Sequence, residues 1–486
     1  MSFTLQVFIL ISLPFVFALY FLKSYISSSK SQKNLPPSPP KLPLIGNLHQ
    51  LGSSPYRALQ SMARTYGPVM LIRLGSVPVL VASSSDAARE ILKTHDTIFA
   101  NRPSLNFFVF KDIAFAQYGE YWRQAKSIAV LHILSNKRVQ SYRYVREEEI
   151  ALLIENIQKA NESVVNLSEL VNSVTNNVLC RVTLGRRCDG RQFKSMLDRT
   201  MKLLGSFSVG RYIPSLGWVD RLSGVEGKVK EVYKEFDEFL EDVIQEHANK
   251  KKVDVECRDV VDILLEIQSD NVMGFPLEKD MIKAILLDLL VGGTDTSSTS
   301  LEWAIAELLR HPQAMKELQQ EALVTGERMS MITEDKLEKM PYLKSVLKEA
   351  LRLHAPGPLL IPHESTQDVK VLGYDIPSGT QVLIHATAIG RDPSKWEAAE
   401  DFIPERFLNN PIDYKGFNFE FIPFGAGRRR CPGIQFAMVV NELVLANLVY
   451  KFNFELVGKE SPDMSEVNGL TVHKKYPILV SAIPHC

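Results

Sequence analysis

The apolar and polar positions of this chain follow one pattern near its start and another through most of its length. Residues 3–22 carry no charge and are mostly apolar, about the length that a helix needs to cross the hydrocarbon core of a bilayer. Further along, apolar residues recur at helical spacing, which predicts amphipathic helices. These helices include residues 85–95, 145–160, 229–252 and 311–323.

Two stretches have the pattern of β-strands instead. Residues 69–83 are rich in branched apolar residues and contain a Gly-Ser break, which predicts a hairpin. Residues 369–386 form a second strand region, with turn residues at Gly373 and at Ser378-Gly379. The fold class that follows is mainly α with a minor β region.

One helix, expected between Glu278 and Pro312, differs from the rest. It would be roughly 50 Å long at the rise of an α-helix, and its first half is apolar on nearly every face, which predicts burial all round. Its centre nevertheless holds Gly292 and Gly293, which together cost roughly 2 kcal/mol against alanine in a helix interior. Two interpretations stay open: a functional notch that something enters, or a close helix crossing.

The composition narrows the classes of protein that fit. The 486 residues include 56 basic and 56 acidic side chains, so no net charge favours nucleic acid as a partner. The hydrophobic fraction of 45% is typical of a folded protein. Five widely spaced cysteines without a CxxC pair argue against a structural zinc site or a disulfide framework.

The residues that follow the apolar run indicate how it would lie in a membrane. Four lysines occur between residues 23 and 41, and no acidic residue precedes Asp86, so the bulk of the chain should face the cytosol. A cleaved signal peptide is the alternative, but positive charge at the start and an A-x-A site are both missing. We expect a transmembrane anchor over residues 1–23, a basic, proline-rich hinge over 24–43 and one large domain over 44–486.

Three charged residues far apart in the sequence form a candidate cluster. Glu349 and Arg352 lie three positions apart on a predicted helix, so their side chains share one face. Taken alone, such a pair is most often a weak surface ion pair. Arg406, within the irregular stretch Pro-Glu-Arg-Phe, is a candidate second partner for Glu349.

The stretch FGAGRRRCPG, residues 424–433, combines three glycines, three arginines and one cysteine. It could be a buried cysteine beside a basic turn, a phosphate-binding loop, or a metal-ligating thiolate in a positive pocket. A phosphate loop would end in Gly-Lys-Ser/Thr before a helix, and Cys-Pro-Gly does not. A merely buried cysteine leaves the glycines and arginines without a purpose.

The order of these motifs resembles the cytochrome P450 superfamily, and the resemblance extends over the whole chain. Details such as YGEYWRQAK, PFGAGRRRCPG and IGRDPSKW are similar to its plant microsomal, A-type branch. The resemblance implies the cytochrome P450 fold with one N-terminal transmembrane helix. The matching positions are Gly292–Ser297, Glu349, Arg352, Pro404–Phe407, Phe424, Gly427, Arg429, Cys431 and Gly433.

The resemblance makes Cys431 the thiolate ligand of the iron in haem b, iron protoporphyrin IX. Phe424 would pack near the sulfur, and Gly427 and Gly433 would let the backbone pass close under the porphyrin. Arg429 and Trp122 would contact a haem propionate, helped by Lys126, which stands where relatives have arginine and lacks its bidentate fork. The implied structural triad consists of Glu349, Arg352 and Arg406.

On the opposite side of the haem, the resemblance assigns residues to oxygen and to substrate. Thr296 would hydrogen-bond dioxygen, Asp295 would relay protons, and Gly292 would help make room for oxygen. Apolar loops at the family's substrate-contact regions predict a lipophilic small molecule, although these side chains could simply pack the core. The candidates are Phe107, Phe108, Phe110, Leu359, Leu360 and Leu470.

The function implied is that of a haem-thiolate monooxygenase in the endoplasmic reticulum membrane, with its catalytic domain in the cytosol. NADPH–cytochrome P450 reductase would supply electrons, cytochrome b5 would be a further partner, and membrane lipid and O₂ would be contacted. The substrate would be a specialised metabolite, a terpenoid ahead of a coumarin or other phenolic. The alternatives are a haem-thiolate isomerase or dehydratase, which typically lacks the acid–threonine pair, and a non-catalytic haem protein for electron transfer or gas sensing.

Overall fold

A computed structural model describes most of the chain beyond its first 33 residues. The described ranges are 34–104, 112–160, 163–188, 191–206, 208–249, 258–270, 275–458 and 460–485. The predicted anchor, the first part of the hinge, and the loop residues Phe107, Phe108 and Phe110 lie outside them.

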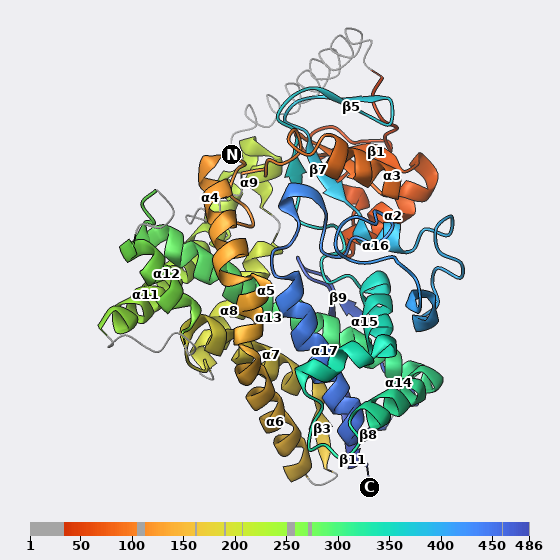
Figure 1. The fold of residues 1–486 in the computed structure, drawn as a ribbon. Helices are drawn as coiled ribbons and strands as arrows, with labels where there is room; N and C mark the ends of the chain where they lie inside the picture. The colour runs from red at the N-terminus through yellow and green to blue at the C-terminus, as the bar shows by residue number, and fades with distance from the viewer. Residues whose placement is uncertain are drawn as a thin grey trace, which may run out of the picture.

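Helices make up most of the described structure, as the sequence predicts (Figure 1). The α-helices are α2 (Pro55–Tyr66), α3 (Ser85–Arg89), α4 (Glu120–Ile128), α5 (Asn136–Ser141), α6 (Arg143–Lys159), α7 (Leu167–Leu184), α8 (Arg191–Leu204), α9 (Val209–Tyr212), α10 (Trp218–Leu222), α11 (Val225–Asn249), α12 (Val260–Asp270), α13 (Lys279–Arg310), α14 (Pro312–Thr325), α15 (Pro341–Leu353), α16 (Ala386–Gly390) and α17 (Ile434–Lys451). Short 3-10 turns include Leu48–Gln50, Pro214–Leu216, Glu334–Lys339, Pro404–Phe407 and Gly427–Arg429, and wider π turns extend α3 over Glu90–Thr94 and α4 over Ala129–Ile133.

The strands form small sheets, and the largest lies at the upper right of Figure 1. Its order is β1-β2-β7-β4, in which β2 and β7 run parallel and the other neighbours antiparallel. The predicted hairpin is confirmed, because β1 pairs with β2 from Val69 opposite Ala82 to Leu74 opposite Val77. The strands are β1 (Val69–Leu74), β2 (Val77–Ala82), β3 (Val164–Asn166), β4 (His363–Glu364), β5 (Val369–Val371), β6 (Tyr374–Ile376), β7 (Gln381–Ile384), β8 (Phe452–Leu456), β9 (Glu466–Val467), β10 (His473–Lys474) and β11 (Leu479–Pro484).

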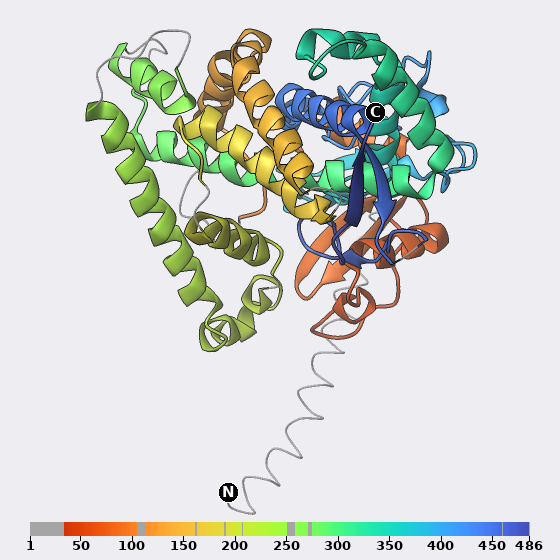
Figure 2. The same cartoon turned by 90° about the horizontal axis from the view of Figure 1, so that it is seen from below.

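Helix α13 is the central element of the fold. It runs unbroken through its glycine pair and packs against α7, α15, α17 and β10, among others. In Figure 2 its green ribbon crosses the molecule beneath the helices at the upper side. Its apolar first half is buried from Met281 to Leu287, as predicted.

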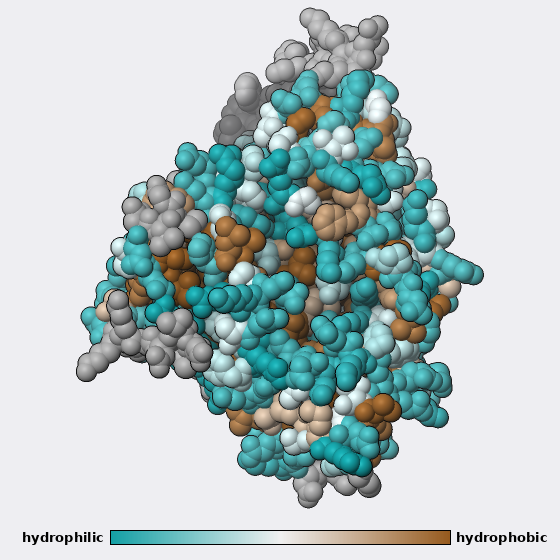
Figure 3. Space-filling view, viewed as in Figure 1, coloured by the Kyte–Doolittle hydropathy of each residue, from teal (hydrophilic) through white to brown (hydrophobic). Residues whose placement is uncertain are grey.

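Helix α17 is the second long core element, and it begins three residues after Cys431. Among the described residues it alone is long and apolar enough to cross a membrane, but two-thirds of that stretch is buried inside the protein. We therefore assign it to the core. Figure 3 shows hydrophobic residues scattered in small groups over one face of the molecule, without a broad apolar patch.

Candidate functional site

The cysteine loop, residues 424–433, contains the 3-10 turn Gly427–Arg429 and ends at the start of α17. Its backbone closes on itself, since the Cys431 amide donates to the Phe424 carbonyl over 3.0 Å. Gly427 has a φ of +67°, and a Cβ there would overlap the carbonyl oxygen of Leu92. The missing side chain of Gly427 therefore lets the loop pack on the neighbouring π turn, and the predicted clearance for a porphyrin stays a prediction.

Cys431 does not form a disulfide, and its side chain is exposed. The surrounding protein nevertheless desolvates it, and this burial raises the pKa of the thiol. A side chain that is both accessible and desolvated is expected where it lines a hollow within the protein. The Gly433 amide donates to the sulfur, and this hydrogen bond and the charges of Lys126 and Arg430 offset part of the rise in pKa that burial causes.

Arg429 reaches from this loop to the segment that precedes α4. It donates to the carbonyls of Ala100 (2.7 Å) and Ala116 (2.6 Å), and its guanidinium lies 4.2 Å from the centre of the Trp122 ring. The indole N–H of Trp122 donates to Ile113 over 3.0 Å. The structure therefore brings Arg429 and Trp122 together, and their contact with a propionate stays a prediction.

Two further cations lie beside Arg429. The Lys126 ammonium donates to the Arg430 carbonyl over 2.6 Å, and burial lowers its pKa to about 8. Arg102, which no motif marks in the sequence, is buried and donates to the carbonyls of Ile361 and Pro362. Burial, followed by repulsion from Arg429, lowers the pKa of Arg102.

Two carboxyl groups anchor the segment around Ile113. Asp112 accepts the Phe115 amide at 2.6 Å, and Asp288 of α13 accepts the Ile113 amide at 2.5 Å. Burial raises the pKa of Asp112 to about 6, and burial and the nearby Asp112 raise that of Asp288. Sequence reasoning missed both residues, because each follows or interrupts an apolar run without any recognisable spacing.

The two central glycines of α13 have different roles. A Cβ on Gly293 would lie 2.9 Å from Cδ2 of Leu179 on α7, so this glycine permits a close helix crossing. Gly292 is exposed in the middle of an otherwise buried helix, and a Cβ there would meet nothing within 4 Å. The close helix crossing is therefore confirmed at Gly293, and the functional notch stays a prediction for Gly292.

Thr296 and Asp295 direct their polar groups to different places. The Thr296 hydroxyl donates to the Gly292 carbonyl over 2.7 Å. The Asp295 carboxylate accepts from the Thr471 hydroxyl and lies 3.3 Å from Nε2 of His473. The C-terminal segment that holds Leu470 is thus tied to the centre of α13, and His473 is a residue that sequence reasoning missed.

The remaining substrate-contact candidates take part in packing. Leu359 packs against the buried cluster of β1 and β2, and Leu360 against a cluster that includes β7. Leu360 also lies near the cysteine loop, because a Cβ on Gly425 would be 3.6 Å from its Cδ1. Leu470 is half-buried. Core packing therefore accounts for Leu359 and Leu360, and their contact with substrate stays a prediction.

Glu349, Arg352 and Arg406 meet as the sequence suggests. Arg352 donates two bonds of 2.7 Å to the two carboxylate oxygens of Glu349, and Arg406 donates to the same carboxylate at 3.0 Å. The Glu349 and Arg352 side chains are completely buried. The expectation of a weak surface pair, which rests on the spacing alone, is therefore wrong. The pair is buried because α15 packs against the 3-10 turn Pro404–Phe407.

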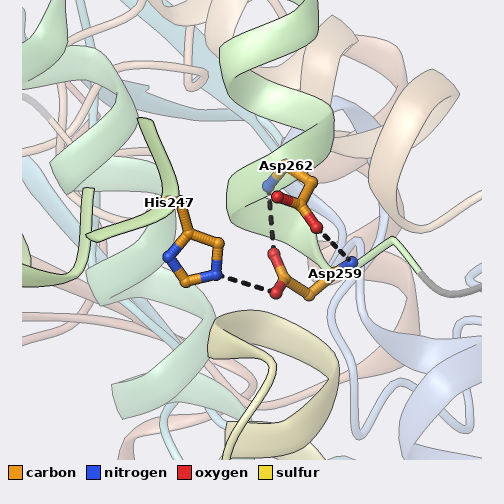
Figure 4. Close-up of side chains that lie close together, drawn as sticks. All are labelled: His247, Asp259 and Asp262. Carbon is orange, nitrogen blue, oxygen red and sulfur yellow. Dashed lines mark hydrogen bonds and ion pairs between the residues drawn. The ribbon is translucent and has the colours of Figure 1, made fainter. Parts of the chain in front are cut away.

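A separate histidine–carboxylate group joins α11 to α12 (Figure 4). His247 lies with Nδ1 2.7 Å from the Val243 carbonyl and Nε2 2.9 Å from Asp259. Asp259 and Asp262 each accept the other's backbone amide, the pattern of a helix start. We interpret the group as a helix cap fixed by an ion pair.

A polar cavity of about 320 Å³ lies elsewhere, between α2, α13 and the end of α15. Tyr56, Arg57, Trp303, His354 and Glu466 are among its lining residues, and Cys431, Thr296 and the other predicted site residues are not. Its presence therefore adds nothing to the site described above.

Comparison with known proteins agrees with this arrangement. The family model for cytochrome P450 matches residues 36–481. The chain is 52% identical to a 3-beta-hydroxylase of Tanacetum parthenium (99% of this chain and 98% of the relative) and to a psoralen synthase of Ammi majus (96% of each). It is 49% identical to a norfluorocurarine oxidase of Strychnos, again over 96% of each chain.

The chain belongs to the cytochrome P450 family. It is a monooxygenase of that family, which holds haem b and receives its electrons from a reductase. Its resemblance to plant members of the family, first inferred from motifs, is confirmed.

The described residues suit a haem. An accessible thiol, an exposed Gly292 within a buried helix, and a cationic group of Arg102, Lys126 and Arg429 supply a ligand, open space and positive charge. Cys431 would bind the iron, and the cations would face the propionate carboxylates. When bound, the haem supplies the oxidation chemistry; the Cys431 thiolate would set its electronics, and Asp295 and Thr296 would hold and transfer protons.

Proposed function

We propose that this protein hydroxylates a small lipophilic specialised metabolite, using O₂ and electrons from NADPH–cytochrome P450 reductase. The observation that carries this is the Cys431 thiol, which is accessible, accepts the Gly433 amide and lies close to Lys126 and Arg430. A structural cysteine would need none of these features. In this proposal Glu349, Arg352 and Arg406 stabilise the fold on the cysteine side.

The chain's own groups have separate tasks in the proposed reaction. Lys126 and Arg429 hold the cofactor's carboxylates, and the open space at Gly292 leaves room for oxygen. The Thr296 hydroxyl and the Asp295 carboxylate hold and transfer protons. Retention of this acid–threonine pair argues against the isomerase or dehydratase alternative.

A terpenoid is the first candidate substrate class, on the resemblance to the plant branch. A coumarin is the second, and a specific finding favours it: relatives named psoralen synthase, from Ammi majus and from Pastinaca sativa, are each 52% identical to this chain. Apolar Leu359, Leu360 and Leu470, together with the aromatic loop at Phe107, Phe108 and Phe110, would contact either substrate.

We also propose that residues 1–23 anchor the protein in the endoplasmic reticulum membrane, residues 24–43 form the hinge, and residues 44–486 form the cytosolic catalytic domain. Leu44, Trp218 and Leu222 support this orientation, because they are large apolar residues exposed by 61%, 57% and 78%. Their two segments lie on the same lower side of Figure 2. Cytochrome b5 would be a further cytosolic electron donor.

The ligand assignment is tested by the spectrum of the reduced, carbon-monoxide-bound protein. Wild type should show the Soret band of thiolate ligation, and Cys431→Ser should lose it. Cys188→Ser, at a half-exposed cysteine elsewhere, should keep it. A wild-type band in Cys431→Ser would reject the proposal.

The substrate class is tested separately. Panels of terpenoids and coumarins are titrated against the ferric protein, and those that shift its spin state are incubated with reductase and NADPH. Products that gain one oxygen atom identify the class. A protein that binds members of both panels without forming product would instead favour the non-catalytic alternative.

A further inference from the structure

The carboxylate of Asp295 belongs to a network of four side chains that links α13 to β10. Thr471 donates its hydroxyl proton to Oδ2 of Asp295, and its oxygen lies 2.8 Å from Nε2 of His473. Nδ1 of the same histidine lies 2.9 Å from the hydroxyl of Thr299. Both ring nitrogens of His473 thus contact a hydroxyl oxygen.

The hydroxyl protons of this network indicate the charge state of His473. A threonine hydroxyl carries one proton, and that of Thr471 is already directed to Asp295. The hydroxyl proton of Thr299 is likewise directed to the Asp295 carbonyl, over 2.7 Å. With both hydroxyl protons directed to Asp295, each hydroxyl oxygen is left to accept from His473, and this arrangement favours the imidazolium form of the ring.

The charges around His473 are those that an imidazolium needs. Asp295 and Glu302 face it from α13 and Asp198 faces it from α8, while the adjacent Lys474 is the cation beside it in β10. Burial alone would lower the pKa of His473, but the hydrogen bond and charge of Asp295 outweigh it, and the net shift is upward. The His473 side chain is 35% exposed, so it can exchange protons with water.

We propose that His473 is the proton-bearing partner of Asp295 and a positioning residue for the reaction. It holds the carboxylate in place, and it can pass its Nε2 proton to Thr471 while Thr471 passes its own to Oδ2 of Asp295. The products of this step are a neutral imidazole and a protonated Asp295, and water then returns a proton to the exposed ring. The inference rests on the proposed role of Asp295 in proton transfer.

The charge state is tested by NMR, without turnover. Full-length, haem-loaded protein carrying [¹³Cε1]-histidine is studied in its diamagnetic ferrous carbon-monoxide form, from about pH 5 to about pH 9. The resonance that disappears in His473→Gln should titrate at higher pH than that of exposed His49, which His49→Gln identifies. Asp295→Asn should move this titration to lower pH. A His473 resonance that is neutral at pH 7, or indifferent to Asp295→Asn, overturns the proposal.

Coupling of electrons to product tests the relay itself. His473→Gln and Thr471→Val should each lower the product formed per NADPH several-fold and release the difference as hydrogen peroxide, most strongly at a pH where the wild-type His473 ring is protonated. Thr471→Ser, which keeps the hydroxyl, should restore coupling, and His49→Gln should leave it unchanged. Wild-type coupling in His473→Gln at every pH would overturn the role.

These outcomes are separate from those that decide the proposed function. The carbon-monoxide spectrum of each variant shows whether the haem site is intact, and it should match wild type in His473→Gln. A lost thiolate band in Cys431→Ser with an uncharged His473 would keep the function and reject the relay. A charged, Asp295-dependent His473 beside an unchanged Cys431→Ser spectrum would do the reverse.

Discussion

Two charged networks, one on each side of the predicted haem site, are built in different ways. On the cysteine side, Glu349 bonds directly to Arg352 and Arg406, and Arg352 also donates to the carbonyls of Gly390 and Ala399. On the oxygen side, Asp295 reaches His473 mainly through the Thr471 hydroxyl. Direct, fully buried ion pairs resist movement, whereas hydroxyl-linked groups near water can transfer protons. The first network is built to hold the fold, and the second contains the groups that the proposed proton transfer needs.

Removing the buried carboxylate should have the largest effect on stability. Glu349→Gln leaves two arginines without their charged partner, which should lower the free energy of unfolding by about 3–5 kcal/mol. Urea unfolding measures this. Glu155→Gln, which breaks an exposed pair with Lys159, is the matched control and should cost about 0.5 kcal/mol or less. Equal losses would mean that the buried network has no special structural weight.

The histidine at position 385 should give the next largest effect, with a pH dependence opposite to that of His473. Burial lowers the pKa of His385 to about 4. Its contribution to the free energy of unfolding is therefore fully present above the unfolded-state pKa near 6.5, and it is lost as the pH falls through 4. The loss should reach about 3 kcal/mol. His473, whose pKa is raised, should contribute below 6.5 and lose its contribution as the pH rises.

The measurement compares wild type with His385→Asn, which can still accept the Ala388 amide that His385 accepts at 3.1 Å. Unfolding is followed near pH 7 and near pH 4. The free energy of unfolding should differ less between the two pH values in His385→Asn than in wild type. An unchanged difference would show that His385 does not control acid stability.

Glycine substitutions in the cysteine loop should have an intermediate effect. Gly427→Ala must adopt a positive φ and displace the Leu92 carbonyl, so it should cost about 2 kcal/mol or more. Gly433→Ala has a φ of −87°, and its new Cβ would meet only the Cys431 sulfur at 3.9 Å, so the fold should tolerate it. Thermal unfolding distinguishes them, and similar midpoints would contradict the packing role of Gly427.

The smallest effect is expected within the central helix. Gly292→Ala meets no neighbour and should stabilise α13 by up to about 1 kcal/mol, whereas Gly293→Ala meets Leu179 and should lose that gain. Unfolding measurements compare the two. Gly292→Ala should also weaken the spin-state response to substrate, because it fills the open space. If the spin-state response to substrate were weaker in Gly293→Ala alone, the open space would belong to Gly293 and not to Gly292.

Local patterns were enough to place several elements of the fold. The hairpin at Gly75-Ser76 follows from branched residues around a turn, and the course of α13 follows from its apolar positions and the proline at 312. The spacing of Glu349 and Arg352 also put both on one helical face. Spacing could not show that the pair is buried, because burial depends on the 3-10 turn that packs on α15 from more than fifty residues later in the chain.

The amino-acid sequence alone defined the family, the thiolate candidate Cys431 and the acid–threonine pair, because these depend on residue types at short, ordered spacings. The tertiary structure assigned Gly427 to packing and Gly293 to a helix crossing, and it placed Arg102 beside Arg429. It also brought His473 to Asp295 across 178 positions of the chain. Contacts of that kind arise from how helices and strands pack, and no local pattern encodes them.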